Sequence, residues 1–209
     1  MFLSSSSPGA VKASKNTTDV SALVSVLNYL HPISPEIENY FKNHISSYSL
    51  RKKKLLLKAN MPCDHLYFIK KGVLRGYVKQ GLKEVTTWIT AENELVTSIA
   101  RLSKPQPSRE YIQAIENCEL LVMKIDDLEN LYNTIPEFNT VGRKLLQLYY
   151  GHAEERAFIA RVAKAEDKYH YFVENNNHLV NRIPLTYIAS YLGIRLETLS
   201  KVRSRLSKK

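Results

Sequence analysis

Cysteine is scarce in this sequence, and its scarcity excludes two classes of protein. The two cysteines, Cys63 and Cys118, stand far apart and follow no metal-binding spacing, so neither a disulfide framework nor a zinc site is expected. No run of 18 or more apolar residues exists, which excludes a membrane-spanning helix. The N-terminus also lacks the apolar segment of a signal peptide. We therefore interpret the chain as cytoplasmic, with both thiols reduced.

The usual patterns of an active site are missing as well. A metal site inside a β-barrel needs several histidines that converge on the interior, yet only His65 lies in the segment that reads as strands. We find no Gly-rich phosphate loop, no Ser-His-Asp set and no paired carboxylates. We predict that the chain is not an enzyme and carries no metal or cofactor. Whether it binds an unknown small-molecule effector is left open.

Acidic residues are outnumbered, and the excess of positive charge is concentrated near the C-terminus. The chain has 30 Lys and Arg against 20 Asp and Glu, a net charge of +10. More than half of this excess comes from the last 28 residues, whose one acid is Glu197 and whose bases are Arg182, Arg195, Lys201, Arg203, Arg205, Lys208 and Lys209. Such a local charge favours an anionic partner. A second run, RKKK at 51–54, predicts a solvated turn or strand edge; the alternative is a second nucleic-acid patch.

The spacing of apolar residues divides the chain into four parts. Residues 1–20 form a tail rich in Ser and Thr. Residues 21–135 begin with helical spacing at Leu23, Val26, Leu27 and Leu30, and continue as short strands separated by glycine turns at Gly72, Gly76 and Gly81. Many short strands of this kind predict a jelly-roll-like antiparallel β-roll. A long helix over 136–163 and a helical unit over 164–209 follow, so the fold class is α+β.

The long helix carries an apolar seam. Its apolar members are Phe138, Val141, Leu145, Leu148, Ile159 and Val162, and they fall on alternating spacings of three and four residues, with His152 and Glu155 at the two intermediate positions. A seam of this kind favours contact with a second copy of the same helix. The alternative is that the helix packs only against its own β-roll.

The stretch IASYLGIRLETLSKVRSRL at 188–206 reads as two short helices around one glycine. Gly193 can take the left-handed conformation that ends the first helix. The apolar residues predicted to face inward are Leu185, Ile188, Ala189 and Leu192 on the first helix, and Leu196, Leu199, Val202 and Leu206 on the second. This spacing is typical of a helix-turn-helix.

The outward face of the second helix is polar and basic. Its early residues are placed to meet base edges in a DNA groove, and the candidates are Arg195, Glu197, Ser200 and Lys201. The candidates for phosphate contacts are Thr186, Tyr187, Thr198, Arg203 and Arg205. The alternatives are a helical hairpin with a solvated basic face, and a protein-interaction or ligand-sensing module whose helix-turn-helix is degenerate.

At this point the chain resembles the Crp/Fnr family of transcriptional regulators, over about residues 21–209. LYFIKKGVLRGYV at 66–78 resembles the first hairpin of the family's cyclic-nucleotide-binding-like β-roll, and GIRLETLSKVRSRL at 193–206 resembles its recognition helix. By the matching positions, Glu197, Thr198 and Lys201 take the places of DNA-contacting residues. The resemblance implies a homodimer that binds double-stranded DNA and acts on RNA polymerase.

The sequence departs from the family in three places. Members that bind cyclic AMP carry Gly-Glu and later Arg-Ser or Arg-Thr, whereas here Thr97 and Ser98, then Ser108 and Arg109, occupy the equivalent segment. We therefore predict an effector pocket that does not respond to cyclic AMP. The N-terminal cysteine cluster of iron–sulfur members is absent. The sequence stops at Lys209, so we expect little or no wing after the recognition helix.

Overall fold

The computed structural model describes residues 18–98 and 106–206, and most of the predicted tail lies outside them. Two helices open the described chain, α1 (Ser21–Leu30) and α2 (Pro35–His44). Ser34 is the N-cap residue of α2, but its side chain makes no capping hydrogen bond. Its backbone N–H donates instead to Glu137 Oε1 at 3.1 Å, which fixes α2 beside the start of the long helix.

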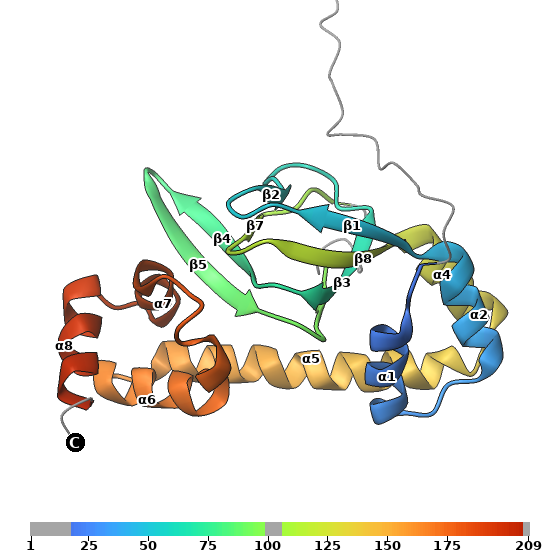
Figure 1. The fold of residues 1–209 in the computed structure, drawn as a ribbon. Coiled ribbons are helices and arrows are strands. Elements are labelled where there is room, and N and C mark those ends of the chain that lie inside the picture. The colour runs from blue at the N-terminus through green and yellow to red at the C-terminus, as the bar shows by residue number, and fades with distance from the viewer. Residues whose placement is uncertain (1–17, 99–105, 207–209) are drawn as a thin grey trace, which may run out of the picture.

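The strands pair into two antiparallel four-stranded sheets that face each other as a β-roll (Figure 1). One sheet has the order β1-β8-β3-β6, formed by β1 (Ser46–Leu50), β8 (Cys118–Lys124), β3 (His65–Lys71) and β6 (Leu95–Val96). The other has the order β2-β7-β4-β5, formed by β2 (Leu55–Leu57), β7 (Tyr111–Ala114), β4 (Leu74–Gln80) and β5 (Lys83–Thr90). The predicted antiparallel β-roll is confirmed, and β5 lies at the edge of its sheet.

Two of the three predicted glycine turns are present, and the third is wrong. Gly72 and Gly81 have φ angles of 110° and 60° and lie between strands. Gly76 instead lies inside β4, where a Cβ would come within 2.2 Å of the Trp88 ring. This glycine is needed for close packing, and not for a turn. The RKKK run forms an exposed turn between β1 and β2, as predicted.

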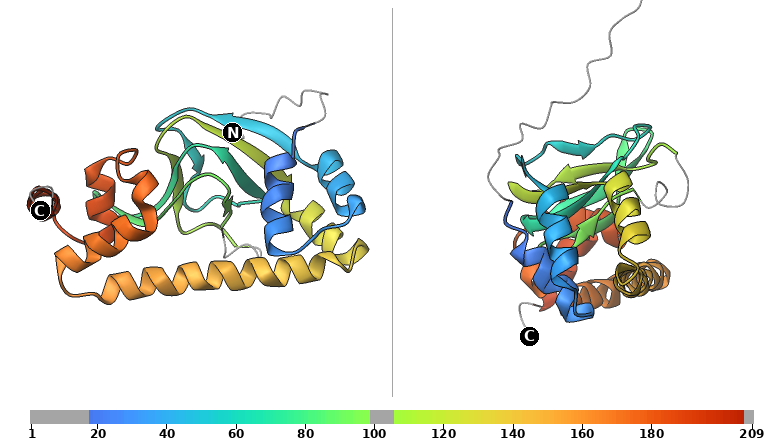
Figure 2. Two further views of the ribbon diagram at one scale, coloured as in Figure 1. Left: turned by 60° about the horizontal axis from the view of Figure 1, so that its bottom comes forward. Right: turned by 90° about the vertical axis from the view of Figure 1, so that its right-hand side faces the viewer.

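The C-terminal half is helical. Helix α4 (Ile125–Thr134) leads into the 24-residue α5 (Phe138–Arg161), which runs beneath the β-roll in Figure 1. After the three residues 162–164 come α6 (Ala165–Asn176), the 3₁₀ turn η1 (Asn177–Leu179), α7 (Leu185–Leu192) and α8 (Leu196–Leu206). Helices α6, α7 and α8 gather at one end of α5, and α1 crosses the other end (Figure 2).

Buried apolar side chains collect at three places in the described chain. One cluster joins α1, α2 and α4 to the start of α5. Another fills the β-roll. The third surrounds α6, α7 and α8, but it also contains Val73, Ala91 and Ile115 of the β-roll. The helical unit at the C-terminus therefore shares its core with the β-roll.

Candidate nucleic-acid interface and cavity

Helices α7 and α8 meet at the predicted glycine. Gly193 has φ 65° and ψ 34°, which is left-handed, and its N–H bonds back to the last carbonyls of α7. The inward residues Ile188, Leu192 and Leu199 are almost completely buried. Leu196 was predicted to face inward, but its side chain is 37% exposed, because it stands in the first turn of α8 before the helices meet. The arrangement is that of a helix-turn-helix.

A buried lysine supports this turn. Only 9% of Lys168 is exposed, and its Nζ donates to the carbonyl of Leu192 at 3.0 Å and to that of Ala160 at 3.5 Å. These carbonyls end α7 and α5, where unpaired C=O groups favour a cation. Lys168 thus ties the end of the long helix to the turn. No sequence pattern indicated this role, because one lysine on a polar helix usually faces water.

The outer face of α8 is open. All four candidates for base contact, Arg195, Glu197, Ser200 and Lys201, are exposed. Of the phosphate candidates, Thr186 and Arg205 are exposed, while Thr198 and Arg203 are half-buried.

Tyr187 lies differently from the other phosphate candidates. Its ring stacks under the Arg75 guanidinium, with 3.7 Å from the Arg75 Cζ to the ring centroid. Tyr187 therefore faces the β-roll, and we withdraw it as a phosphate contact.

A cavity of about 1090 Å³ lies between the β-roll and α5. It is large enough for a small organic ligand. Its wall includes β5, the segment around Ser108, the inner side of α5 and, from the C-terminal unit, Asn175, Asn176, His178 and Leu179. A ligand that filled this cavity would touch the β-roll, α5 and the C-terminal helical unit.

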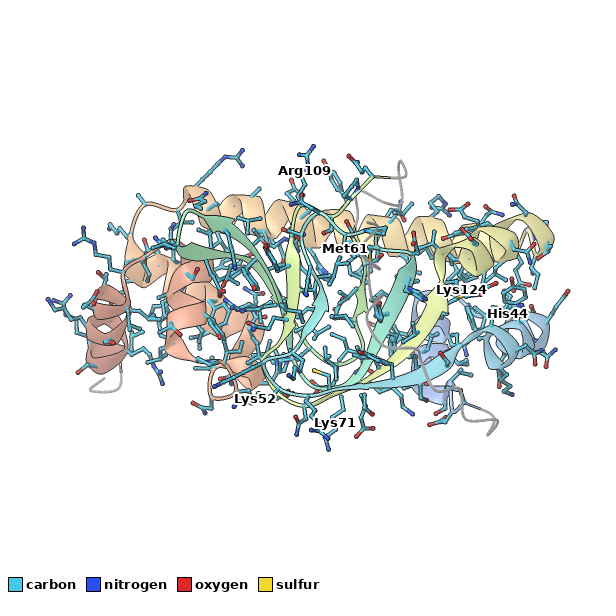
Figure 3. All side chains as sticks on the ribbon, turned by 90° about the horizontal axis from the view of Figure 1, so that it is seen from above. His44, Lys52, Met61, Lys71, Arg109 and Lys124 are labelled. Atoms are coloured by element: carbon cyan, nitrogen blue, oxygen red, sulfur yellow. The ribbon has the colours of Figure 1, made fainter. Side chains whose placement is uncertain are left out.

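The four residues predicted for an effector pocket line this cavity, but most of their polar groups already have partners. Thr97 Oγ1 donates to the His65 carbonyl at 3.0 Å. Ser108 Oγ donates to the carbonyl of Glu110 at 3.0 Å and accepts from its N–H at 3.1 Å. Ser98 is buried, and the exposed Arg109 side chain points away from the β-roll at the edge of the molecule (Figure 3).

Carboxylates on the cavity wall are also engaged. Trp88 Nε1 donates to Glu110 Oε2 at 2.8 Å, and the Tyr149 hydroxyl donates to Glu94 Oε2 at 2.8 Å. Burial, reinforced by the Glu94 charge, raises the pKa of Tyr149, so its hydroxyl stays protonated. Tyr149 also accepts the N–H of Leu95 at 2.7 Å, which fastens α5 to the start of β6.

The residues present do not fit a cysteine-ligated iron–sulfur cluster. Such a cluster usually needs four thiolates, and the whole sequence has two cysteines. Both are buried, and burial raises the pKa of Cys118 to about 11. Within residues 18–98 and 106–206, no group of three or more His, Cys, Asp or Glu side chains is placed to hold a metal ion. No helix in these ranges is long and apolar enough to cross a membrane.

An ion pair missed at the sequence level joins the helix-turn-helix unit to the β-roll. Arg182, just before α7, bonds both carboxylate oxygens of Glu92 at 2.9 and 2.7 Å, and it also pairs with Glu116. Hydrogen bonds from Arg182 lower the pKa of Glu92 from 4.5 to about 2. Since this pKa is depressed, the pair contributes fully above pH 4.5 and is lost as the pH falls towards 2.

The seam predicted along the long helix is corrected in part. Phe138 and Val141 are buried against α1, α2 and α4, Leu145 packs on the same cluster, and Ile159 lies in the core of the helix-turn-helix unit. These side chains face the chain's own interior. Leu148, His152 and Val162 are incompletely buried. Heptad spacing identified an apolar face, but the β-roll and the helices around it already cover most of that face.

A different stripe of α5 is apolar and uncovered. Leu146 and Tyr150 are 66% and 74% exposed, and Ala153 and Ala157 continue the same spacing on exposed positions. We call these four residues the α5 stripe. In the left view of Figure 2, α5 runs along the lower edge of the molecule with no other element below it.

Comparisons with known proteins agree with this architecture. Residues 48–134 match the family described as cyclic nucleotide-binding domain. The anaerobic regulatory protein of Pasteurella multocida is 25% identical over 171 residues, which cover 76% of this chain and 62% of that protein. The fumarate and nitrate reduction regulatory protein of Yersinia pestis is 24% identical over 172 residues, 76% of this chain and 68% of its own length. The match thus spans less than two thirds of the Pasteurella relative.

Solved structures share the fold. FixK2 from Bradyrhizobium japonicum aligns with a TM-score of 0.67 at 20% identity, covering 78% of this chain and 85% of its own. A CooA mutant from Carboxydothermus hydrogenoformans aligns with a TM-score of 0.65 at 19% identity, covering 92% and 87%.

Proposed function

We propose that the chain is a Crp/Fnr-type regulator of transcription: a homodimer that binds DNA sequence-specifically and does not respond to cyclic AMP. Its place of action is the cytoplasm, with double-stranded DNA as its ligand and RNA polymerase as a further partner. The relatives named as regulatory proteins support this proposal.

The observation that carries the proposal is the exposed face of α8. Arg195 and Lys201 can donate to guanine, and Glu197 can accept from cytosine. All three stand free of the protein's own core, on a helix held by a helix-turn-helix turn.

Selection of bound fragments from random DNA tests the proposal. A dimer related by a two-fold axis should return an imperfect palindrome with half-sites about one helical turn apart. Recovery of fragments with no shared motif would contradict it and would favour a protein-interaction module with a degenerate helix-turn-helix.

The homodimer is proposed to form through the α5 stripe. Its spacing of four, three and four residues is that of a coiled-coil seam, and its large side chains are mostly exposed in the single chain. Leu146, Tyr150 and Ala153 also line the cavity, so a second α5 placed there would narrow its mouth.

Cyclic AMP should not stabilise the protein. The family's ribose contact needs an acid where Ser98 stands, and the Thr97 hydroxyl is already bonded within the chain. Millimolar cyclic AMP should therefore leave the melting temperature unchanged, with 5′-AMP as the control nucleotide. A shift of several degrees that saturates at micromolar cyclic AMP, and is absent with 5′-AMP, would show that the cavity binds it.

A further inference from the structure

Polar contacts dock the helix-turn-helix unit on the β-roll from both sides. Arg182 reaches from that unit to Glu92 and Glu116 of the β-roll. In the other direction, Arg75 of β4 contacts α7, and its side chain is only 2% exposed. The Arg75 Cζ lies 3.7 Å from the ring centroid of Tyr187 on α7 and 4.3 Å from that of Tyr77 on β4.

Arg75 is itself held rigidly. Its Nε and Nη2 donate to Gln113 Oε1 at 3.0 and 2.7 Å, and Nη2 also pairs with Glu84. A guanidinium fixed in this way presents a flat cationic face to Tyr187, a geometry that favours a cation–π contact. The β-roll therefore offers α7 a preformed surface.

A third contact covers the edge of the sheet. The N–H of Thr86 on the edge strand β5 donates to Ser190 Oγ of α7 at 2.9 Å, and that hydroxyl lies 3.2 Å from the carbonyl of Glu84, to which it donates. The Thr86 amide is thus protected by the other unit rather than by a neighbouring strand. We call Arg75, Arg182 and Ser190 the docking residues.

The docking leaves the DNA-reading face free. It uses the inner side of α7 and the segment before it, whereas Arg195, Glu197 and Lys201 on α8 remain exposed. The contact therefore does not mask the recognition helix. It sets the angle of that helix, which the short non-helical link at 162–164 would not fix alone.

We propose that the docking residues are positioning residues that fix the orientation of α8 relative to the β-roll, so that two copies present their recognition helices at the spacing of a two-half-site operator. This inference rests on the proposed function. A loosened unit can still fit one half-site, but it must lose orientational freedom to engage the second. Loss of docking should thus weaken binding to the full operator and spare the half-site.

Arg182→Met is the direct test. In a folded dimer it should lower affinity for the full palindrome at least 10-fold, with half-site affinity within two-fold of wild type. Lys42→Met is the matched control, since it removes an exposed ion pair with Glu38 on α2 and should change neither affinity. An unchanged full-operator affinity, or an equal loss on both DNAs, would overturn the inference; equal loss would make Arg182 a DNA contact.

Hydrogen exchange without DNA separates this inference from the proposed function. The Thr86 amide should exchange at least 10-fold faster in Arg182→Met than in wild type, because its partner Ser190 moves away. If Arg182→Met does not fold, Glu92→Gln combined with Glu116→Gln removes the same charges from the β-roll side. An unchanged Thr86 rate in either folded variant overturns the docking role, whereas a wild type that selects no operator overturns the proposed function alone.

Discussion

Leu146→Asp should convert the dimer into monomers. Leu146 is the first residue of the α5 stripe and is 66% exposed in the single chain, so the substitution leaves the monomer's core intact. In a two-fold interface each residue of the seam is buried twice, and each unpaired carboxylate would cost about 3 kcal/mol or more. Light scattering should report the mass of one chain, and affinity for a palindrome should fall to that for a half-site.

Leu148→Asp is the matched control for this result. Leu148 is the same residue type, only two positions away, and therefore projects to nearly the opposite side of the helix. It belongs to the seam predicted from spacing and is 37% exposed. The dimer should survive this change. A monomeric wild type, or dissociation by Leu148→Asp while Leu146→Asp remains dimeric, would contradict the α5 stripe as the interface.

Replacing Lys201 or Glu197 with Ala should cost about 1–3 kcal/mol on the best DNA site and relax sequence preference at one position in each half-site. Both side chains are exposed on α8, so the loss would come from DNA contacts and not from folding. The measurement is a binding isotherm on the selected site and on sites that differ at single base pairs.

The later arginines should behave differently. Loss of Arg205 should weaken binding to all sequences about equally and reduce the salt slope by roughly one unit. Lys58→Ala, at an exposed lysine after β2, is the control and should affect neither quantity. If Lys201→Ala binds as tightly as wild type and keeps the same preference, α8 does not read bases.

The sequence was most informative where the signal is local. Gly193 was expected to end the first helix in the left-handed conformation, because glycine adopts it without strain, and its φ of 65° confirms this. The turns at Gly72 and Gly81 followed from glycines that separate short strand-like runs, and both residues have positive φ angles. Gly76 was wrongly placed in a turn. A glycine is required there because the Trp88 ring on the neighbouring strand leaves no room for a Cβ, and no local pattern shows that contact.

The candidate site was less predictable because it depends on pairing between distant segments. Arg182 counted only as part of a basic run, yet it is neutralised by Glu92, 90 positions away. Arg75 carried one usable signal: it follows the apolar pair Val73 and Leu74 at the start of β4, where a buried charge needs a partner. The predicted seam on α5 was corrected in part for a related reason. Spacing shows that α5 is apolar on more than one side, but only the packed structure shows which side α1 and the β-roll already cover.

The contact of Ser190 with the edge strand also bears on the solubility of the protein. An uncovered edge strand offers unpaired N–H and C=O groups to other chains and is a common route to aggregation. The hairpin of β4 and β5 carries a completely exposed Leu82 at its tip, which adds to that hazard. By bonding to β5 at Thr86 and Glu84, α7 blocks edge-to-edge association through this strand. A β-roll separated from its helix-turn-helix unit would lose this shield.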